Sequence, residues 1–359
     1  MTKRNPLSPN EIQHFILEHV GDHPRDIASL AAKHFGITRQ ALSRHLQALT
    51  AKNLLLAAGS TRGRSYKLAP LVKRRWEYPI TPALAEDQSW ARDVRPLLQH
   101  HPKNVVDIWH FGFTEMFNNA IDHSGGSRIV VQIEQTAIAT SVGLMDDGIG
   151  IFKKIQTALN LLDERHAVLE LSKGKLTTDP AHHSGQGIFF TSRLLDQFAI
   201  FSGGVSFIHT RVAGEGWIWE NPGTSPGTHV FMKLDNSSTR IDSDVFAEYS
   251  SGDNCDFTKT GIPVRLAQFD DKLVSRSQAK RVLARVDLFK TVMFDFAGVE
   301  TIGQPFADEI FRVFARSHRH IELFAVNTTP QVARAIEAAK AYNLPDTFKG
   351  PDEPGPQGS

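Results

Sequence analysis

The residues best suited to chemistry lie in a helical stretch near the middle of the chain. The stretch from His110 to His123 places Glu115 and Asn119 four positions apart, which puts both side chains on one face of a helix. A carboxylate there can orient or deprotonate a water or a hydroxyl, and an amide oxygen can ligate Mg²⁺ that is already bound to phosphates. Taken alone, such a pair is more often a solvated helix face.

A second candidate motif follows an expected strand. Residues 141–145 are strand-like and lead into Asp146-Asp-Gly148-Ile-Gly150. A carboxylate at a strand end can accept a hydrogen bond from an exocyclic amine, and glycines let the backbone approach a flat base closely. This pattern favours a site for a planar base that carries an amine.

The third motif, Gly185-Gln-Gly187, opens a helix that we expect to continue through Leu195. Glycines at a helix N-terminus leave N–H groups free to bind phosphates. The motif Gly-x-Gly recurs by chance, so it is weak by itself. Further along, Gly227 and Thr228 begin an expected closing strand.

The order of these four motifs resembles the GHKL superfamily of ATP-binding domains, which gyrase, heat-shock chaperones, histidine kinases and mismatch-repair proteins share. The resemblance spans residues 105–234, and the stretch from Glu115 to His123 is also similar to the anti-sigma-factor serine kinases of that superfamily. It implies ATP and Mg²⁺ as cofactors. The site residues that it implies are Glu115 as candidate base, Asn119 as Mg²⁺ ligand, Asp146 as adenine reader, Gly148 and Gly150 around the base, Gly185 and Gly187 at the phosphates, and Thr228 in the adenine-side polar network.

By the same resemblance, residues 152–184 would form the mobile lid over the nucleotide. Four basic side chains of this lid segment could meet phosphates: Lys173, Lys175, His182 and His183. Charges on a lid are more often simply solvated. Hydrolysis is a separate question, because the sequence shows neither a phosphoacceptor histidine on a dimerisation helix nor the domain that supplies a lysine in gyrase-like ATPases.

The N-terminal segment has the pattern of three helices and a hairpin. Apolar residues recur at helical spacing in residues 10–20 and 26–35, Gly36 is an expected C-cap, and Thr38 is the expected N-cap of a third helix. Residues 54–58 and 65–68 then form an expected hairpin. A short helix, a glycine turn and a helix with a polar outer face are typical of a helix-turn-helix.

Residues 8–70 resemble a bacterial winged helix-turn-helix. The third helix would contact bases or phosphates of double-stranded DNA, and the hairpin would contact the backbone or minor groove. The residues assigned to these contacts are Arg39, Gln40, Ser43 and Arg44 on the helix and Arg62 and Arg64 on the hairpin. Winged helices also serve as protein-interaction modules, and a basic face can be merely solvated.

The C-terminal segment alternates strands with helices from residue 262 onward. We expect strands at 264–269, 291–296 and 321–326 and helices at 275–286, 306–317 and 329–342, which indicates a small sheet covered by helices. The run 292–314 resembles a STAS-like domain of unknown function. STAS anti-anti-sigma proteins carry a phosphorylatable serine at the start of the helix after this strand, whereas this chain has Ile302-Gly-Gln-Pro305. An interaction or dimerisation module is therefore favoured over a phosphoacceptor.

Charge is divided unevenly along the chain. The total of 40 Lys and Arg against 39 Asp and Glu gives a net charge of +1, but residues 1–75 hold 13 against 4 and the remainder holds 27 against 35. A basic first fifth joined to an acidic remainder is expected when one end meets a polyanion. No apolar run approaches the roughly 20 residues that span a bilayer. The N-terminus lacks an apolar signal region, and there is one cysteine, Cys255, so we expect a cytoplasmic protein without a membrane partner.

The sequence thus predicts an α/β multidomain chain. The expected parts are a winged helix-turn-helix at 8–70, a linker at 71–104, a GHKL (Bergerat) α/β sandwich at 105–234, a linker at 235–261, a small STAS-like α/β domain at 262–344 and a disordered tail at 345–359.

The expected function is an ATP-binding, DNA-binding transcriptional regulator, in which Mg-ATP bound to the middle domain modulates the binding of the winged helix to DNA. A homodimer would suit two-fold operators, and the STAS-like domain would bind a protein partner. The alternatives are a serine/threonine protein kinase of the anti-sigma-factor type and a DNA-linked GHKL ATPase.

Overall fold

The computed structural model describes residues 9–60, 63–176, 185–211, 215–251, 256–268 and 272–341, with the backbone alone for residues 215–225. The chain divides into two compact units. The first unit comprises Met1–Lys154 and Phe190–Val245, and the second comprises Ile155–Phe189 and Phe246–Ser359. The chain therefore leaves the first unit after residue 154, forms part of the second unit over residues 155–189 and returns to the first unit at residue 190.

The first unit begins with three helices and a hairpin, namely α1 (Pro9–His19), α2 (Ile27–Phe35), α3 (Arg39–Ala51), β1 (Leu55–Ala58) and β2 (Ser65–Leu68). Gly36 ends α2 in the left-handed region, with a φ of 65°. The hydroxyl of Thr38 accepts a hydrogen bond from the backbone N–H of Ala41 and caps α3. Both caps are confirmed, because the sequence offers the residue types that these backbone positions need. Ile16, Ile27 and Leu42 are buried in the small core between the helices.

A five-stranded antiparallel sheet follows, in the order β3-β4-β5-β7-β6. Its strands are β3 (Val72–Pro79), β4 (Arg128–Gln135), β5 (Ala139–Asp146), β6 (Gln197–Thr210) and β7 (Glu215–Asp235). β5 is hydrogen-bonded to β4 on one side and to β7 on the other. The end of β5, which carries Asp146, is therefore held between two neighbouring strands.

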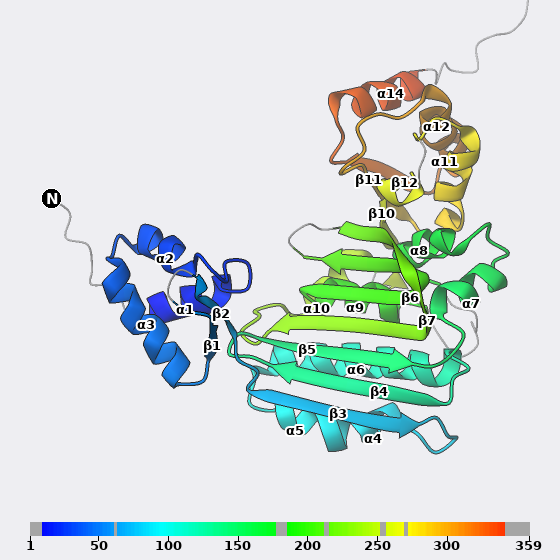
Figure 1. Ribbon diagram of the computed structural model, residues 1–359. Helices are drawn as coiled ribbons and strands as arrows, with labels where there is room; N and C mark the ends of the chain where they lie inside the picture. Colours follow the sequence, from blue (N-terminus) through cyan, green and yellow to red (C-terminus); the bar gives the residue numbers. More distant parts are fainter. Residues whose placement is uncertain are drawn as a thin grey trace, which may run out of the picture. The chain divides into compact units, whose positions relative to one another are not determined.

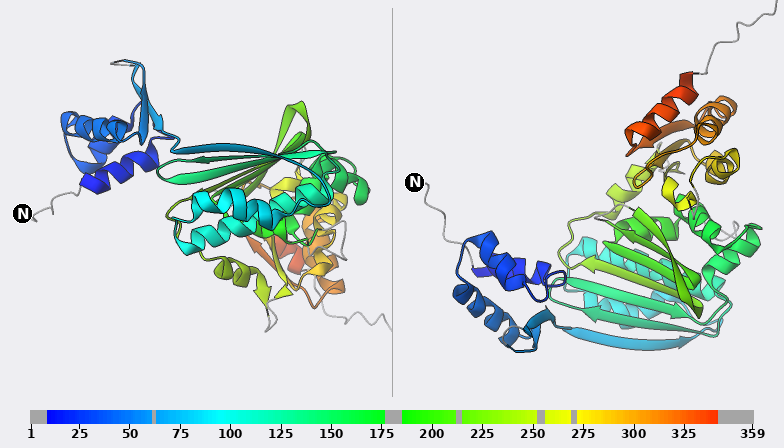
Figure 2. Two further views of the ribbon diagram at one scale, coloured as in Figure 1. Left: turned by 90° about the horizontal axis from the view of Figure 1, so that it is seen from below. Right: turned by 45° about the horizontal axis from the view of Figure 1, so that its top comes forward.

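A layer of helices covers one face of this sheet (Figures 1 and 2), made of α4 (Glu86–Ser89), the π-helix η2 (Trp90–Val94), α5 (Arg95–Leu98) and α6 (Lys103–His123). Phe113, Met116, Phe117 and Ala120 of α6 are buried at helical spacing, which orients the other side of the helix away from the core. Although α6 has 21 residues, neither it nor any other described helix is long and apolar enough to cross a membrane.

Residues 71–104, expected to form a linker, belong to this sheet and its helices. Strand β3 pairs with β4 along all eight of its residues. Tyr78 is buried, its ring meets the edge of Phe117 at a centroid distance of 5.2 Å, and its hydroxyl donates to Asp93 at 2.8 Å. Contacts with residues distant in the sequence hold this segment in place. Its local sequence pattern shows none of these contacts and therefore resembles that of a linker.

The second unit contains α8 (Glu164–Lys173), β8 (Ser250–Ser251) and β9 (Asp256–Phe257), while three helices span the boundaries between the units: α7 (Ile151–Ala158), α9 (Gly187–Leu194) and α10 (Asp242–Tyr249). The carboxylate of Asp163 accepts hydrogen bonds from the backbone N–H groups of Arg165 and His166 and caps α8. Ordered helices therefore occupy much of the expected lid segment.

A three-stranded parallel sheet completes the second unit, in the order β10-β11-β12. Its elements are β10 (Lys259–Pro263), the 3-10 helix η3 (Val264–Ala267), α11 (Arg276–Leu283), the 3-10 helix η4 (Val286–Leu288), β11 (Thr291–Asp295), α12 (Gln304–Asp308), the π-helix η5 (Glu309–Phe314), α13 (Ala315–Ser317), β12 (Glu322–Val326) and α14 (Pro330–Ala341). Ile262, Val292 and Phe294 are fully buried, whereas Met293 between them is half-buried. Helices thus cover one face of the sheet, as the alternation of strands and helices predicts.

One strand of this sheet lies earlier than expected. The expected strand at 264–269 is a 3-10 helix over Val264–Ala267, and the strand is Lys259–Pro263, within the expected linker at 235–261. β10 pairs only with β11. An edge strand tolerates the Gly and Pro of Lys259–Pro263, and the apolar residues 264–267 that suggested a strand are buried as a helical turn.

His209 on β6 makes the first unit sensitive to acid. Burial, together with the charges of Arg193 and Arg240, lowers its pKa to about 3, against about 6.5 in an unfolded chain. Between these values only the unfolded chain takes up the proton, so stability is full above about pH 6.5 and falls as the pH falls toward 3. The upper limit is about 1.4 kcal/mol per pH unit, reduced by the partial exposure of the ring.

Between pH 6.5 and pH 5, we therefore expect the free energy of unfolding of His209→Gln to fall by about 1 kcal/mol less than that of the wild type. Urea unfolding midpoints at the two pH values measure this difference. His320→Gln, at an exposed position after α13, is the control and should leave the pH dependence unchanged. Equal pH dependence in the wild type and His209→Gln would mean that His209 is charged in the folded protein.

Candidate functional site

Asp146 is the centre of a hydrogen-bonded cluster at the end of β5. Its Oδ1 accepts hydrogen bonds from the backbone N–H groups of Gly148 at 2.9 Å and Thr228 at 3.2 Å. Burial raises the pKa of this carboxyl, and the hydrogen bonds from Gly148 and Thr228 oppose that shift. The residue thus presents a half-buried, oriented acceptor. The structure brings Asp146 together with Thr228, 82 positions later in the chain.

Thr228 links the same cluster to the start of α7. Its Oγ1 accepts a hydrogen bond from the backbone N–H of Ile151 at 3.0 Å. Next to it, the hydroxyl of Ser202 on β6 donates to the carbonyl of Gly227 at 3.0 Å. Residues of β5, β6 and β7 and the first residue of α7 therefore meet around the loop from Asp146 to Ile151.

Glycines line this loop because a side chain would not fit. A Cβ at Gly148 would lie 2.1 Å from the carbonyl oxygen of Ser124, and one at Gly227 would lie 2.0 Å from that of Asp146. Gly150 has a φ of 89°, and a Cβ there would lie 2.5 Å from Oγ of Ser202. The absence of side chains at these glycines lets their backbone pack closely against Ser124, Asp146 and Ser202.

Asp147 stabilises the loop from its other side. It accepts hydrogen bonds from the backbone N–H and the hydroxyl of Ser127, both at 2.7 Å, and from the N–H of Arg128. These bonds, that from the Ser127 hydroxyl above all, lower the pKa of Asp147 to about 2. Sequence reasoning assigned no role to Asp147, Ser202 or Gly227, since their partners lie 20 to 81 residues away.

Glu115 and Asn119 lie on α6 beside its buried stripe, and both are half-buried. Their shared helix face is as predicted. The end of α6 contacts α7, because Nζ of Lys154 on α7 donates to the carbonyl of His123 at 2.8 Å. Ile149 likewise donates its backbone N–H to the carbonyl of Ser124 at 3.0 Å. The helix with the Glu-x-x-x-Asn pair is thus tied to the loop that carries Asp146.

Gly185 and Gly187 belong to the second unit. Gly185 is left-handed, with a φ of 67°, and its carbonyl accepts a hydrogen bond from Leu176 at 3.1 Å. Gly187 is the first residue of α9, so the third motif opens a helix as predicted.

The two lysines assigned to phosphates on the lid segment are engaged elsewhere. Nζ of Lys173 is fully buried and donates to Glu170 and to the carbonyls of Arg281 and Ala284. Nζ of Lys175 donates to the carbonyl of Leu288 at 2.8 Å. The assignment of Lys173 to a phosphate is therefore wrong, because all three of its N–H donors are used. His182 and His183 lie outside the described residues.

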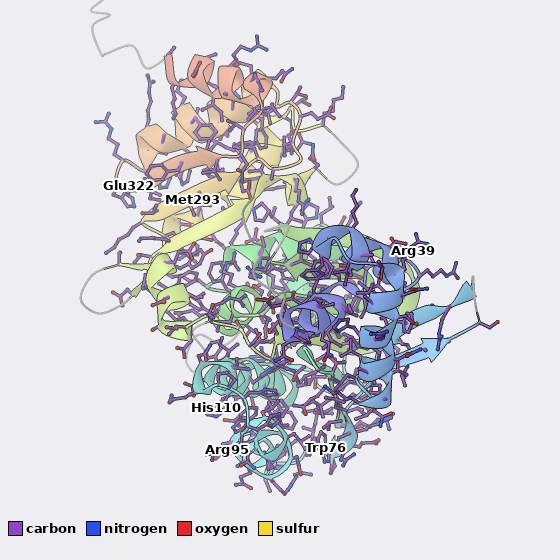
Figure 3. All side chains as sticks on the ribbon, turned by 90° about the vertical axis from the view of Figure 1, so that its left-hand side faces the viewer. Arg39, Trp76, Arg95, His110, Met293 and Glu322 are labelled. Carbon is purple, nitrogen blue, oxygen red and sulfur yellow. The ribbon has the colours of Figure 1, made fainter. Side chains whose placement is uncertain are left out.

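The outer face of α3 is polar and exposed, as the sequence predicts (Figure 3). Its exposed residues are Arg39, Gln40, Ser43, Arg44 and Gln47. The guanidinium of Arg39 donates to the hydroxyl of Ser29 on α2 at 2.9 Å. Arg64 on the hairpin is exposed and lies over the ring of Tyr66, and Arg62 lies outside the described residues.

The fold of the second unit agrees with a family comparison. Residues 278–333 match the family described as STAS-like domain of unknown function (DUF4325). The chain carries a STAS-like domain. A search of curated proteins finds no match to the sequence. Within the described ranges, no group of three or more His, Cys, Asp or Glu side chains is placed to hold a metal ion.

The STAS-like domain has no room for a side chain at the residue before α12. Gly303 is the N-cap of α12, and a Cβ there would lie 2.7 Å from Cα of Val274. The N–H of Gly303 also donates to the carbonyl of Leu273 at 2.7 Å. A serine at this helix start would require the backbone to move, whereas Thr301, two positions earlier, is exposed.

Proposed function

We propose that the protein is a DNA-binding regulator whose sheet domain binds Mg-ATP and thereby modulates the binding of its N-terminal domain to double-stranded DNA. The observation that carries this proposal is the cluster around Asp146, which joins residues of β5, β6, β7 and α7. These hydrogen bonds link residues from distant parts of the chain around Asp146, Gly227 and Thr228.

The chemistry of the cluster fits adenine. Asp146 offers a carboxylate that backbone N–H groups orient, which suits an exocyclic amine as donor. Gly148 and Gly150 stand where any Cβ would collide with neighbouring atoms. A flat ring can approach such a backbone closely.

Asn119 would hold the Mg²⁺ that accompanies the phosphates, and Glu115 would be the candidate base. Both lie on α6, whose last residue, His123, accepts a hydrogen bond from Lys154 of α7. The magnesium ion would neutralise phosphate charge in an otherwise acidic part of the chain. Gly185 and Gly187 would supply backbone N–H groups to the phosphates.

A fluorescent ATP analogue tests the nucleotide site. Asp146→Asn is expected to weaken its affinity about 10- to 100-fold, because a hydrogen bond to a charged acceptor contributes about 1.5–3 kcal/mol. Asn119→Ala is expected to weaken Mg²⁺-dependent binding about 10-fold or more. The matched controls are Glu134→Gln, a partly exposed carboxylate on β4 that pairs with Lys73, and Asn118→Ala, the residue of α6 before Asn119. Affinity unchanged by both site variants would refute the site.

Titration of duplex DNA with and without Mg-ATP tests the coupling. Immunoprecipitated genomic fragments provide the duplex, and the full chain is used. We expect salt-dependent affinity that Mg-ATP changes at least about 5-fold, the lower range of measured coupling between sites. No affinity of the full chain for any duplex, or identical affinity with and without nucleotide, would count against the regulator.

A further inference from the structure

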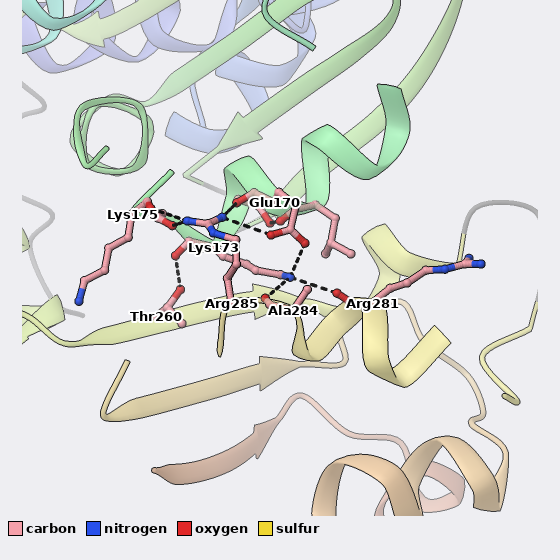
Figure 4. A network of polar contacts seen from close by, with 10 residues as sticks. Glu170, Lys173, Lys175, Thr260, Arg281, Ala284 and Arg285 are labelled. Carbon is pink, nitrogen blue, oxygen red and sulfur yellow. Dashed lines mark hydrogen bonds and ion pairs between the residues drawn. The ribbon is translucent and has the colours of Figure 1, made fainter. Parts of the chain in front are cut away.

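Lys173, the last residue of α8, is a buried cation at the end of a second helix (Figure 4). Its Nζ donates to Oε1 of Glu170 at 2.7 Å and to the carbonyls of Arg281 and Ala284 at 3.1 and 2.8 Å. These carbonyls lie at the end of α11. The last carbonyls of a helix lack partners within the helix and carry the negative end of its dipole. Lys173 therefore caps α11.

Arg285, two residues beyond α11, caps α8 in return. Its guanidinium donates to the carbonyls of Gly174, at 3.3 Å, and Lys175, which follow α8. It also binds the carboxylate of Glu170 at 3.2 Å. Glu170 thus lies between both cations, and the two helix ends share one network (Figure 4). We call Glu170, Lys173, Arg285 and the carbonyls that they bind the reciprocal cap.

The backbone conformation of Arg285 is unfavourable for an arginine, which indicates that its side-chain contacts matter. Its φ is 60°, in the left-handed region that side chains other than glycine rarely adopt. Arginine offers no conformational advantage at such a position. The free energy of placing it there is offset by its contacts with the end of α8.

Two further contacts join α8 to the sheet of the STAS-like domain. The hydroxyl of Thr260 on β10 donates to the carbonyl of Lys173 at 2.7 Å and is buried. Lys175 donates to Leu288 on η4 at 2.8 Å, and its ammonium lies 4.9 Å from the centre of the Phe289 ring. The end of α8 therefore contacts β10, α11 and η4 of the same unit.

The position of α8 in the sequence gives this packing a consequence. In the sequence, α8 lies between the glycine motifs at 148–150 and 185–187, which we propose to bind nucleotide. α8 belongs to the second unit, as the STAS-like domain does. We infer that the reciprocal cap makes α8 and the STAS-like domain move as one body, so that nucleotide binding at the flanking motifs displaces the STAS-like domain together with the lid segment. The trigger rests on the proposed nucleotide site. Separating α8 from α11 would break the ion pair between Glu170 and Arg285 and the hydrogen bonds from Lys173 to the carbonyls of Arg281 and Ala284.

Hydrogen exchange of the full chain without nucleotide tests the reciprocal cap directly. Arg285→Asn removes the guanidinium and retains a residue that tolerates a left-handed φ. We expect exchange in peptides covering both α8 and α11 to rise about 10-fold or more, while peptides from β4 and β5 stay unchanged. Arg281→Ala is the matched control, because it removes an exposed positive charge from α11 and leaves the accepting carbonyl in place. Thr260→Val is a milder variant, should Arg285→Asn fail to fold.

Exchange with the Mg²⁺ complex of ATP then tests the movement. In the wild type we expect protection to change in α8, β10 and α11 together, and in Arg285→Asn the change should be confined to the segment before residue 176. Nucleotide binding with unchanged exchange in β10 and α11 of the wild type would overturn the inference. Independent responses of α8 and α11 to Arg285→Asn would overturn it as well. If the wild type did not bind nucleotide, the proposed nucleotide site would be refuted. The comparison of Arg285→Asn with the wild type in the absence of nucleotide would still test the reciprocal cap.

Discussion

Replacing Gly227 with alanine is expected to destabilise the first unit by about 3 kcal/mol and to abolish nucleotide binding. Gly227 has a φ of 78°, and a Cβ there would lie 2.0 Å from the carbonyl oxygen of Asp146 and 2.9 Å from its Oδ1. On one side of this contact, β5 and β7 are paired from Met145 and His229 onward, which limits how far the backbone can shift. The alanine would therefore break the hydrogen bond between Thr228 and Asp146, which is 3.2 Å long.

Thermal unfolding of the full chain measures this effect. At about 2–4 °C per kcal/mol, the midpoint should fall by roughly 6–12 °C. Gly261→Ala is the control, since a Cβ at Gly261 on β10 meets no described atom within 4 Å and the φ there is not left-handed. That variant should stay within about 0.5 kcal/mol of the wild type. If Gly227→Ala matched the wild type in midpoint and in affinity for the ATP analogue, β7 would not approach Asp146 as described.

Elements with strong local signals could be predicted from the sequence. Gly36 and Thr38 end and begin helices where the sequence places them, because a left-handed glycine and a capping hydroxyl act on backbone groups one to four residues away. The same holds for α11, which begins after Ser275 with a capping box completed by Gln278. In these places the deciding interaction lies within the window that a sequence pattern covers.

Elements fixed by distant contacts could not be predicted. β3 has only one buried residue, Tyr78, because it is an edge strand whose other residues face solvent in part. Its strand conformation follows from pairing with β4, about 55 residues later. Lys173 shows the same limit, since its partners at Arg281 and Ala284 lie more than 100 residues away. A lysine on an expected lid gives no local sign that it is buried.

The candidate site could be predicted from the sequence only in part. Asp146, Gly148 and Gly150 attract notice because a carboxylate and two glycines follow a strand, and Thr228 because it follows a glycine. Their chemistry was readable, but the hydrogen bond from Thr228 to Asp146 depends on the pairing of β5 with β7. Ser202 had no motif to mark it, and its role follows only from the register of β6 against β7.

Removing two arginines from α3 is expected to weaken duplex binding by the full chain roughly 30- to 150-fold. Arg39 and Arg44 both lie on the exposed face of α3, where each can neutralise a phosphate or reach a base edge. The loss of two such contacts costs about 2–3 kcal/mol in total. Neutralising two fewer phosphates should also reduce the slope of log K against log salt by about 2. Fluorescence anisotropy of a labelled duplex at several salt concentrations measures both quantities.

The decisive comparison for this prediction is with the loss of an exposed arginine far from α3 in the sequence. Arg334→Ala removes an exposed arginine from α14, and it should change neither the affinity nor the salt slope. Because Debye screening limits exposed charges to about 10 Å at 0.1 M salt, only arginines close to the duplex contribute to the slope. If Arg39→Ala/Arg44→Ala kept the wild-type affinity and slope, α3 would not contact DNA. If Arg334→Ala lowered the slope as much as the double variant does, the binding would follow net charge, and α3 would have no special role in it.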